Sequence, residues 1–322
     1  MDVLVVGIGV IGSYLAHAAC DAGNAVTVVA RGRWGDTIRD RGLVIHHHVQ
    51  HKTTIDHPYV VDGIPQGERF DVAVSVMRQD QQIAALDQLE GIDADLLVLV
   101  GNNLRAQELA DRLRSHGHAR RVLFGFQSTA GIRKADHVEC VRWGATGLDV
   151  APLHGEPTAS DKNLLARVFT GGYRPNWTHD FEDWLLYHAA AVLPMCFVSY
   201  LCGCDLRAAS HELLRQMVAA QGEGYALLAR LGHPVAPEGN EGLLDGGLKT
   251  RMWLAVVWIV ARTKIGTLCV DDHCRHAPDE MRDLEAGFER IRGLAPDFPM
   301  PAWDALLARM GNWNEVCRRW GT

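Results

Sequence analysis

Lysine is scarce in this chain of 322 residues, and arginine carries most of the positive charge. The lysines are Lys52, Lys134, Lys162, Lys249 and Lys264. The long stretch from Lys162 to Lys249 therefore has no lysine amine to offer to a reaction or a ligand. Lys and Arg together number 32 against 39 Asp and Glu, so the formal charge is −7. This acidic balance argues against general binding to nucleic acid or to an anionic membrane.

Long apolar runs and cysteine motifs are also missing. The longest apolar stretch, Ala189 to Cys202, is shorter than the ~20 residues that a bilayer requires, so we expect no membrane span. Met1-Asp2 leads straight into an apolar run, without the basic segment typical of a secretory signal. None of the eight cysteines belongs to a C-x-x-C pair. We therefore expect a cytoplasmic protein with reduced thiols.

The first thirty residues combine two apolar runs with a glycine-rich turn. Val3–Val6 predicts a buried strand, and 7–12 follows at once with Gly-Ile-Gly-Val-Ile-Gly. Ser13 to Ala22 has helical spacing, and Ala25–Val29 is a second β-branched run. A glycine pattern of this kind between a strand and a helix is typical of a dinucleotide-binding site.

Each glycine of this turn has a role in such a site. Gly7 permits the tight turn, Gly9 lets backbone amides approach a pyrophosphate, and Gly12 allows the helix to pack closely on the strand. Val10 and Ile11 lie where the helix begins, and a helix N-terminus attracts phosphate. We therefore predict that Gly7, Gly9, Val10, Ile11 and Gly12 bind the cofactor.

The end of the second strand indicates which dinucleotide binds. An NAD site usually has Asp or Glu there, to accept hydrogen bonds from the ribose hydroxyls. Here the chain reads Ala30-Arg31-Gly-Arg, with no acid before Asp36. Because guanidinium binds phosphate and a carboxylate repels it, Arg31 predicts NADP. Arg78, which follows the predicted strand Asp71–Val76, is a second candidate for the same cofactor.

Strands and helices continue to alternate, with predicted strands at Leu96–Val100, Arg121–Phe126 and Val138–Arg142. The alternation predicts an α/β domain of the Rossmann type, with a parallel sheet covered on both faces. Asn102 lies just past the carboxyl end of a strand, where open α/β sheets bind ligands. Its amide is a candidate for orienting the nicotinamide or a substrate hydroxyl, although Asn also suits turns.

The histidines of the first half raise the question of a metal site. His46-His47-His48 is followed by His51 and His57. Adjacent residues of a strand point to opposite faces, so the three neighbours cannot converge on one ion. We therefore expect no metal site.

The composition changes near 171–176, and long helical patterns rich in Ala, Leu and Trp follow. Predicted helices cover Asp183–Leu201, Leu206–Leu231, Leu248–Lys264, Pro278–Arg292 and Pro301–Met310. Pro194 predicts a kink in the first of them. We predict a nucleotide-binding domain at 1–176 and an all-helical substrate and dimerisation domain at 177–322, with the active site in the cleft between them.

Taken together, these residues resemble the ketopantoate reductase family over nearly the whole chain. The resemblance rests on Gly7-x-Gly9-x-x-Gly12, Ala30-Arg31-Gly32, Val76-Met-Arg78-x-x-Gln81, Gly101-Asn102, Gly125-Phe-Gln-Ser-Thr-Ala-Gly131, Trp184 and Asp279-Glu280. It implies NADPH as cofactor, reduction of a 2-oxo group to a 2-hydroxy acid, and a Rossmann domain joined to a helical domain. It also implies that Glu280 is the acidic residue that holds the substrate.

The chain departs from the family in the first helix of the second half. The family has a lysine about two residues after the tryptophan, which protonates the carbonyl oxygen, but here Leu185 or Leu186 takes its place. Some donor must meet the charge that develops on that oxygen. His188, within about one turn, is the nearest candidate, and Tyr187 is a weaker one.

Two further histidines, His273 and His276, lie just before Glu280 and could line the same cleft. We therefore expect His188, Asn102 and Glu280 as catalytic residues. Each has a structural alternative: a core histidine, a turn asparagine and a carboxylate in the first turn of a helix.

The sequence thus predicts an NADP-dependent oxidoreductase that exchanges a hydride between NADPH and a carbonyl, a 2-oxo group or a secondary alcohol, on a substrate other than ketopantoate. The alternatives are a genuine ketopantoate reductase with a substituted proton donor and a non-catalytic NADP-binding sensor. A small-molecule substrate is expected, with no nucleic acid and no membrane partner, and the Trp-rich helical half could supply the face of a homodimer.

Overall fold

The computed structural model describes residues 1–142, 147–170, 172–263 and 266–321. The chain divides into two compact units, Met1–Phe181 and Glu182–Thr322. We predicted the boundary five residues earlier, between 176 and 177. Two predicted features, the linker residue Gly171 and the helix end at Lys264, lie outside the described residues.

The N-terminal unit contains an eight-stranded sheet with the order β12-β11-β8-β7-β6-β1-β2-β5. The strands are β1 (Asp2–Val6), β2 (Ala25–Val29), β5 (Tyr59–Val61), β6 (Arg69–Val76), β7 (Asp93–Val100), β8 (Val122–Gln127), β11 (Leu148–Ala151) and β12 (Pro175–Trp177). From β5 to β8 every pair of neighbours is parallel, and β11 runs antiparallel to β8. A Rossmann-type sheet followed by a helical unit is therefore the fold, as predicted.

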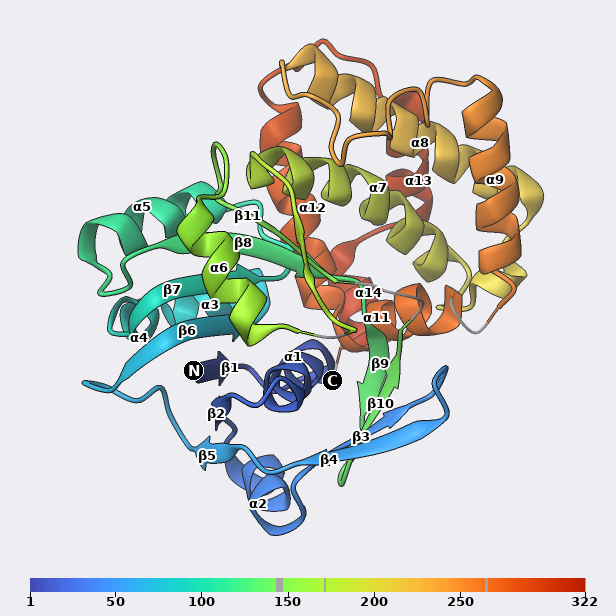
Figure 1. The fold of residues 1–322 in the computed structure, drawn as a ribbon. Coiled ribbons are helices and arrows are strands. Elements are labelled where there is room, and N and C mark those ends of the chain that lie inside the picture. Colours follow the sequence, from blue (N-terminus) through green and yellow to red (C-terminus); the bar gives the residue numbers. More distant parts are fainter. Residues whose placement is uncertain (143–146, 171, 264–265, 322) are drawn as a thin grey trace. The chain divides into compact units, whose positions relative to one another are not determined.

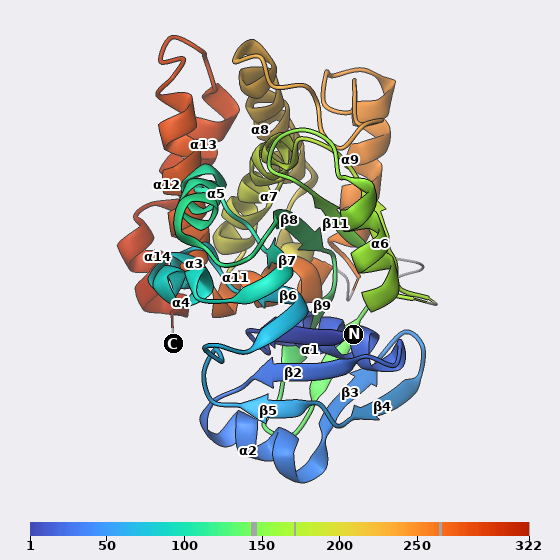
Figure 2. The ribbon, with the colours of Figure 1, turned by 60° about the vertical axis from the view of Figure 1, so that its left-hand side comes forward.

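Helices cover both faces of this sheet because its strands are apolar on both sides. Val3 and Val5 share one cluster with residues of α1 (Val10–Asp21) and α6 (Ala159–Val168), while Leu4, between them, faces the other side. That other face is covered by α3 (Gln79–Ala84), α4 (Leu86–Glu90) and α5 (Ala106–His116), as Figures 1 and 2 show.

A second, four-stranded sheet was not predicted. Its order is β4-β3-β10-β9, with β3 (Leu43–His47), β4 (Lys52–Asp56), β9 (Ala130–Arg133) and β10 (Val138–Val141). The predicted strand Val138–Arg142 is therefore not part of the main sheet: it pairs with β3 and β9. Helix α1 lies beside the small sheet as well as the large one (Figure 1). The short polar strand β4 has too few apolar residues to be recognised from sequence.

The C-terminal unit is helical. It contains α7 (Phe181–Leu201, whose first residue ends the N-terminal unit), α8 (His211–Arg230), α9 (Leu248–Val260), α11 (Asp272–His276), α12 (Pro278–Arg292), α13 (Pro301–Met310) and α14 (Trp313–Trp320), with short turns at Leu206–Ala208 and Thr267–Asp271. The predicted bounds of α12 and α13 are correct, and α14 was not predicted. Trp303 of α13 stacks on Phe288 of α12, with ring centroids 4.7 Å apart, and lies in the core of this unit.

Helix α7 passes the length and composition test for a membrane span. It extends eight residues N-terminal of the apolar run, so the length of that run does not exclude a span. However, 72% of its most apolar window is buried inside the structure. This burial is typical of the central helix of a helical bundle, which must be apolar on all sides.

Candidate cofactor and proton-transfer sites

The glycine loop between β1 and α1 is shaped by close backbone contacts. Gly7 has a φ of +90°, and a Cβ added there would collide with the carbonyl oxygen of Val76 on β6. A Cβ on Gly12 would collide with the carbonyl oxygen of Gly7. Both positions therefore require glycine for the packing of loop, strand and helix, as predicted from the spacing.

Gly9 lacks a side chain for a different reason. No heavy atom of the described residues lies within 4 Å of an added Cβ, and Gly9 is exposed. It caps α1 without a side-chain hydrogen bond, and the first turn of α1 has no acidic residue. The first backbone N–H groups of α1, which include those of Val10 and Ile11, thus begin at an open surface with no carboxylate to repel an anion. This arrangement fits a pyrophosphate.

Arg31 lies at the N-cap of α2 (Gly32–Arg41), directly after β2, and is exposed. The nearby acids are neutralised by another residue: Arg39 donates to Asp36 at 3.0 Å and to Asp62 at 2.8 Å. No ion pair of Arg31 is found among the described residues. Its guanidinium therefore fits a 2′-phosphate.

Arg78, the second predicted cofactor residue, is placed differently. It caps α3 and forms an ion pair with Asp80 at 3.0 Å. Its backbone N–H donates to Oε1 of Gln81 at 3.3 Å. The Arg78-x-x-Gln81 pattern therefore caps the N-terminus of α3. Since Asp80 offsets its charge, the guanidinium of Arg78 is less available to a phosphate than that of Arg31.

Asn102 lies in the loop after β7. Buried side-chain amides of α3 form hydrogen bonds to this loop. Asn103 donates to Oε1 of Gln82 at 2.9 Å, and Leu104 N–H donates to Oε1 of Gln79 at 2.8 Å. Both glutamines and Asn103 are buried. Asn102 itself is half-buried. Sequence reasoning missed Gln79 and Gln82 as positioning residues, although two glutamines on one helix just after a strand were a visible signal.

All of these residues belong to one edge of the main sheet. The neighbouring strands β7, β6, β1 and β2 are parallel, so the loops after them leave at their carboxyl ends. These loops carry, in that order, Asn102, Arg78, Gly7–Gly12 and Arg31. Ligands of open α/β sheets bind at this edge.

The helical unit has its own cluster around His188. The imidazole of His188 stacks on Trp184 one turn earlier, with centroids 4.9 Å apart and an interplanar angle of 14°. Burial, assisted by the positive charge of His273, lowers the pKa of His188 to about 4. His188 is therefore neutral near pH 7.

His273 connects this cluster to the predicted acidic residue. Its Nε2 lies 3.5 Å from Oε2 of Glu280, which is buried in the first turn of α12, whereas about two fifths of the His273 side chain is exposed. A half-exposed imidazole beside a buried carboxylate is suited to proton transfer. Sequence reasoning named His273 only as a residue that could line the cleft.

Other candidates have structural roles. Leu185 and Leu186, the positions at which the resemblance leads us to expect the family's lysine, are buried. The hydroxyl of Tyr187 donates to the backbone oxygen of His233 at 2.9 Å. Nδ1 of His276 contacts the backbone oxygen of Asp272 at 2.7 Å. His273, by contrast, forms an ion pair with the Glu280 carboxylate.

Comparison with known families tests the resemblance. A family model described as ketopantoate reductase PanE/ApbA matches residues 3–151, within the N-terminal unit. The resemblance to the ketopantoate reductase family is confirmed for this part of the chain. No curated protein matches the chain.

Solved structures extend the likeness of fold to the whole chain. A PanE/ApbA family ketopantoate reductase from Ralstonia eutropha JMP134 is 17% identical, with a TM-score of 0.73 and 100% of both chains covered. A 2-dehydropantoate 2-reductase from Methylococcus capsulatus is 16% identical, with a TM-score of 0.67, covering 100% of this chain and 98% of that one.

A third structure is a ternary complex of D-mandelate dehydrogenase with NADH and anilino(oxo)acetate. It is 12% identical, with a TM-score of 0.73, and covers 98% of this chain and 99% of that one. At these identities the likeness establishes the fold: that of ketopantoate reductases and related dehydrogenases.

Proposed function

We propose that this chain is an NADP-dependent oxidoreductase that interconverts a carbonyl compound and its alcohol, on a substrate other than ketopantoate. The observation that carries the proposal is the open Gly9 at the start of α1, together with the exposed and unneutralised Arg31 after the neighbouring strand β2, at the same sheet edge. A pyrophosphate and a 2′-phosphate require these two features.

The N-terminal unit holds the cofactor in this proposal. Gly7 and Gly12 keep the loop close to β6, Gly9 leaves room for the pyrophosphate, and Arg31 binds the 2′-phosphate. Asn102 orients the nicotinamide or the substrate hydroxyl. The bound dinucleotide supplies or accepts a hydride.

The helical unit supplies the groups that manage the proton. Negative charge develops on the carbonyl oxygen during reduction, so a positioned N–H must meet it. His188 is neutral near pH 7 and acts in this proposal as a hydrogen-bonding group. His273, beside the Glu280 carboxylate, carries and delivers the proton. The two histidines thereby divide the role that the family's lysine fills alone.

The absence of that lysine also bears on the substrate. The positions corresponding to the lysine are buried leucines, so a substrate placed for that lysine would meet no donor there. A larger 2-oxo acid, or the matching 2-hydroxy acid, could reach His188 one turn further along α7. The bound anilino(oxo)acetate of the D-mandelate dehydrogenase structure supports testing aryl-substituted acids.

Turnover assays test this proposal. NADPH oxidation is followed with ketopantoate and with a panel of larger 2-oxo acids, and NADP⁺ reduction is followed with mandelate. The proposal expects turnover of a larger acid and little or none of ketopantoate. Efficient turnover of ketopantoate would mean that the substrate assignment is wrong, and NADPH binding without turnover of any acid would favour a sensor.

His273→Gln tests the proton donor separately. It should slow the chemical step by the ~10²–10⁴-fold typical of a lost acid–base group while leaving NADPH binding unchanged. His276→Gln is the matched control, because His276 lies one turn further along and contacts backbone instead of Glu280. An unchanged rate in His273→Gln would remove His273 from the mechanism.

We also propose that the protein is a cytoplasmic homodimer that acts on a small molecule, without a nucleic acid or membrane partner. Helix α9 carries an apolar stripe at the spacing i, i+4, i+8 and i+11: Leu248, Met252, Val256 and Ile259, all exposed. A second copy of the same stripe is the partner that would cover it in a two-fold dimer.

A further inference from the structure

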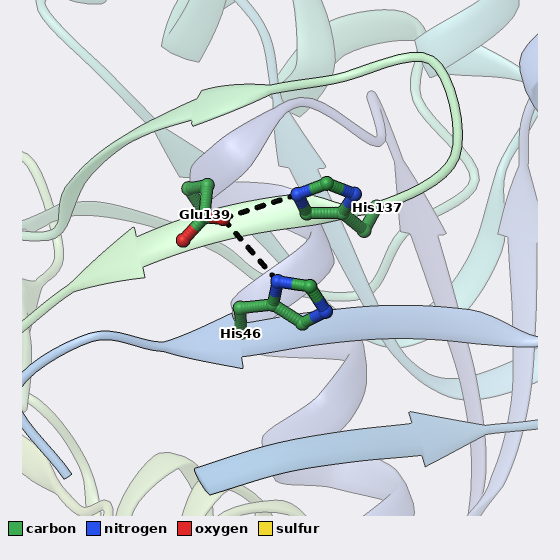
Figure 3. A group of neighbouring side chains, drawn as sticks. All are labelled: His46, His137 and Glu139. Atoms are coloured by element: carbon green, nitrogen blue, oxygen red, sulfur yellow. Dashed lines mark hydrogen bonds and ion pairs between the residues drawn. The ribbon is translucent and has the colours of Figure 1, made fainter. Parts of the chain in front are cut away.

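The small sheet brings two histidines and a glutamate together on one face. Glu139 of β10 is the direct register partner of His46 on β3. His137 directly precedes β10, and its Nε2 contacts the same carboxylate at 3.1 Å. Figure 3 shows a ring nitrogen of each histidine directed at the Glu139 carboxylate.

We expected no metal site because adjacent residues of one strand point to opposite faces. This excludes His47, which lies on the opposite face from His46, is buried, and contacts Oγ1 of Thr54 through Nε2 at 2.8 Å. The other two residues of this cluster come from the adjacent strand β10 and from the residue that precedes it. The parallel pairing of β3 with β10 joins residues 93 positions apart, which no local pattern reveals.

The distances in this cluster suit a metal ion. Oε1 of Glu139 lies 3.2 Å from Nδ1 of His46 and 3.1 Å from Nε2 of His137, and the three ligand atoms all lie within 4.8 Å of one another. Two ligands of a tetrahedral Zn²⁺, each bonded at about 2.0–2.1 Å, are separated by about 3.3 Å. The rings of His46 and His137 are stacked, with centroids 4.1 Å apart, so they must rotate out of this stack for both nitrogens to bind one ion.

The far ring nitrogen of His137 contacts a carboxylate, as is usual for a histidine that binds a metal ion. Nδ1 of His137 contacts Oδ1 of Asp136 at 2.7 Å, which leaves Nε2 as the nitrogen that faces Glu139. A carboxylate that holds the far nitrogen of a histidine fixes the ring for coordination and raises its basicity as a ligand. All three ligands are half-buried, so water can fill the remaining coordination position.

We propose that His46, His137 and Glu139 form a binding site for a divalent transition metal ion, best matched by Zn²⁺, which joins β3 to β10. Two imidazoles and one carboxylate are ligands that Zn²⁺ accepts with a water molecule as the fourth. The site belongs to the small sheet and is independent of the proposed oxidoreductase activity, because none of its three ligands is among the cofactor or proton-transfer residues.

Equilibrium dialysis of the intact, chelator-treated protein against Zn²⁺, followed by metal analysis, tests the site. We expect about one tightly held Zn²⁺ per chain, and a loss of this binding in His46→Gln and in Glu139→Gln. Since an ion bound only by the folded protein stabilises it, Zn²⁺ should also raise the Tm of the wild type and not that of these variants.

Two more variants separate this site from its alternatives. Asp136→Asn should weaken Zn²⁺ binding by roughly 10- to 100-fold, the usual effect of losing a group that orients a ligand. His48→Gln is the matched control, because His48 is exposed and belongs to the consecutive histidines but not to the cluster. It should bind Zn²⁺ as the wild type does.

Three results would overturn the proposal. They are no retained Zn²⁺ in the wild type, equal losses in His48→Gln and His46→Gln, and full retention in Glu139→Gln. Co²⁺ provides a second measurement, since a tetrahedral protein site gives it an intense visible spectrum that free Co²⁺ lacks. If His46→Gln were unfolded, Glu139→Gln and Asp136→Asn would decide the matter through the same spectrum.

Discussion

Arg31 and Arg78 have the same charge but different surroundings, and this difference makes their roles separable. Arg31 is exposed and its neighbouring acids are paired with Arg39, whereas Arg78 already pairs with Asp80. A hydrogen-bonded charge pair contributes about 1.5–3 kcal/mol. The cofactor preference should therefore depend mainly on Arg31.

Arg31→Glu should raise the Kd for NADPH by roughly 10- to 100-fold and change the Kd for NADH much less, because only NADPH has a 2′-phosphate for a carboxylate to repel. Fluorescence titration of both cofactors measures this. Arg41→Glu, the same charge change at the other end of α2, is the control and should leave both affinities unchanged. Equal losses for the two cofactors in Arg31→Glu would contradict the role.

The lowered pKa of His188 leads us to predict that the free energy of unfolding depends on pH. Its pKa is about 4 in the folded protein, below the ordinary value of 6.5. As pH falls from about 6.5 to 4, the unfolded chain takes up a proton here and the folded chain does not, so the free energy of unfolding decreases. Below about pH 4 both states are protonated and this contribution no longer changes.

His188→Phe keeps an aromatic ring next to Trp184 and removes the titrating group. The variant should lose about 2–3 kcal/mol less stability than the wild type between pH 6.5 and 4, as measured by denaturant unfolding at several pH values. His47 has its pKa lowered to about 4 by burial and should contribute in the same direction in both proteins. Identical pH profiles for the two proteins would contradict the assignment for His188.

At the scale of the elements, two glycines in the turn from β1 to α1 have different roles: Gly12 is needed for packing, and Gly9 is expected to be needed for cofactor binding. Gly12→Ala forces a methyl group against the Gly7 carbonyl and should lower the free energy of unfolding by about 1–3 kcal/mol. Gly9→Ala meets no protein atom within 4 Å and should leave Tm unchanged, yet its methyl group occupies the surface where the pyrophosphate is expected. It should weaken NADPH binding.

Thermal unfolding compares the stability of Gly12→Ala and Gly9→Ala, and NADPH titration compares their affinity for the cofactor. Unimpaired NADPH binding by Gly9→Ala would place the cofactor elsewhere.

Elements with a local signal could be predicted from sequence, and those that depend on distant partners could not. The run Ala25–Val29 and the helix Pro278–Arg292 have bounds that apolar spacing, proline and glycine indicate directly. The small sheet depends on β3 pairing with β10, which is remote along the chain. Its four strands are short, and their polar residues weaken the alternation.

The same distinction applies to the candidate sites. The glycine loop and Arg31 are local patterns, and sequence reasoning placed them at the correct sheet edge. The ion pair of His273 with Glu280 joins α11 to α12, and the amides of Gln79 and Gln82 reach across to the loop after β7. These relations depend on tertiary packing, so the sequence could name some of the residues but not their partners.

At the scale of the whole molecule, α9 makes the oligomeric state testable. Val256→Glu places a charge in the apolar stripe and should shift the proposed dimer toward monomer in light scattering, because burying an unpaired carboxylate is costly. Leu294→Glu is the control, since Leu294 is also exposed and apolar but lies outside α9. A wild-type monomer, or a Val256→Glu dimer, would contradict the proposal.

The most direct test of the central proposal is a titration of the wild-type protein and of Gly9→Ala with NADPH and NADH, followed by nicotinamide fluorescence. The proposal predicts that the wild type binds NADPH more tightly than NADH and that Gly9→Ala, with an unchanged Tm, loses affinity for both. A wild type that binds neither cofactor, or a Gly9→Ala variant that binds NADPH as well as the wild type, would contradict it.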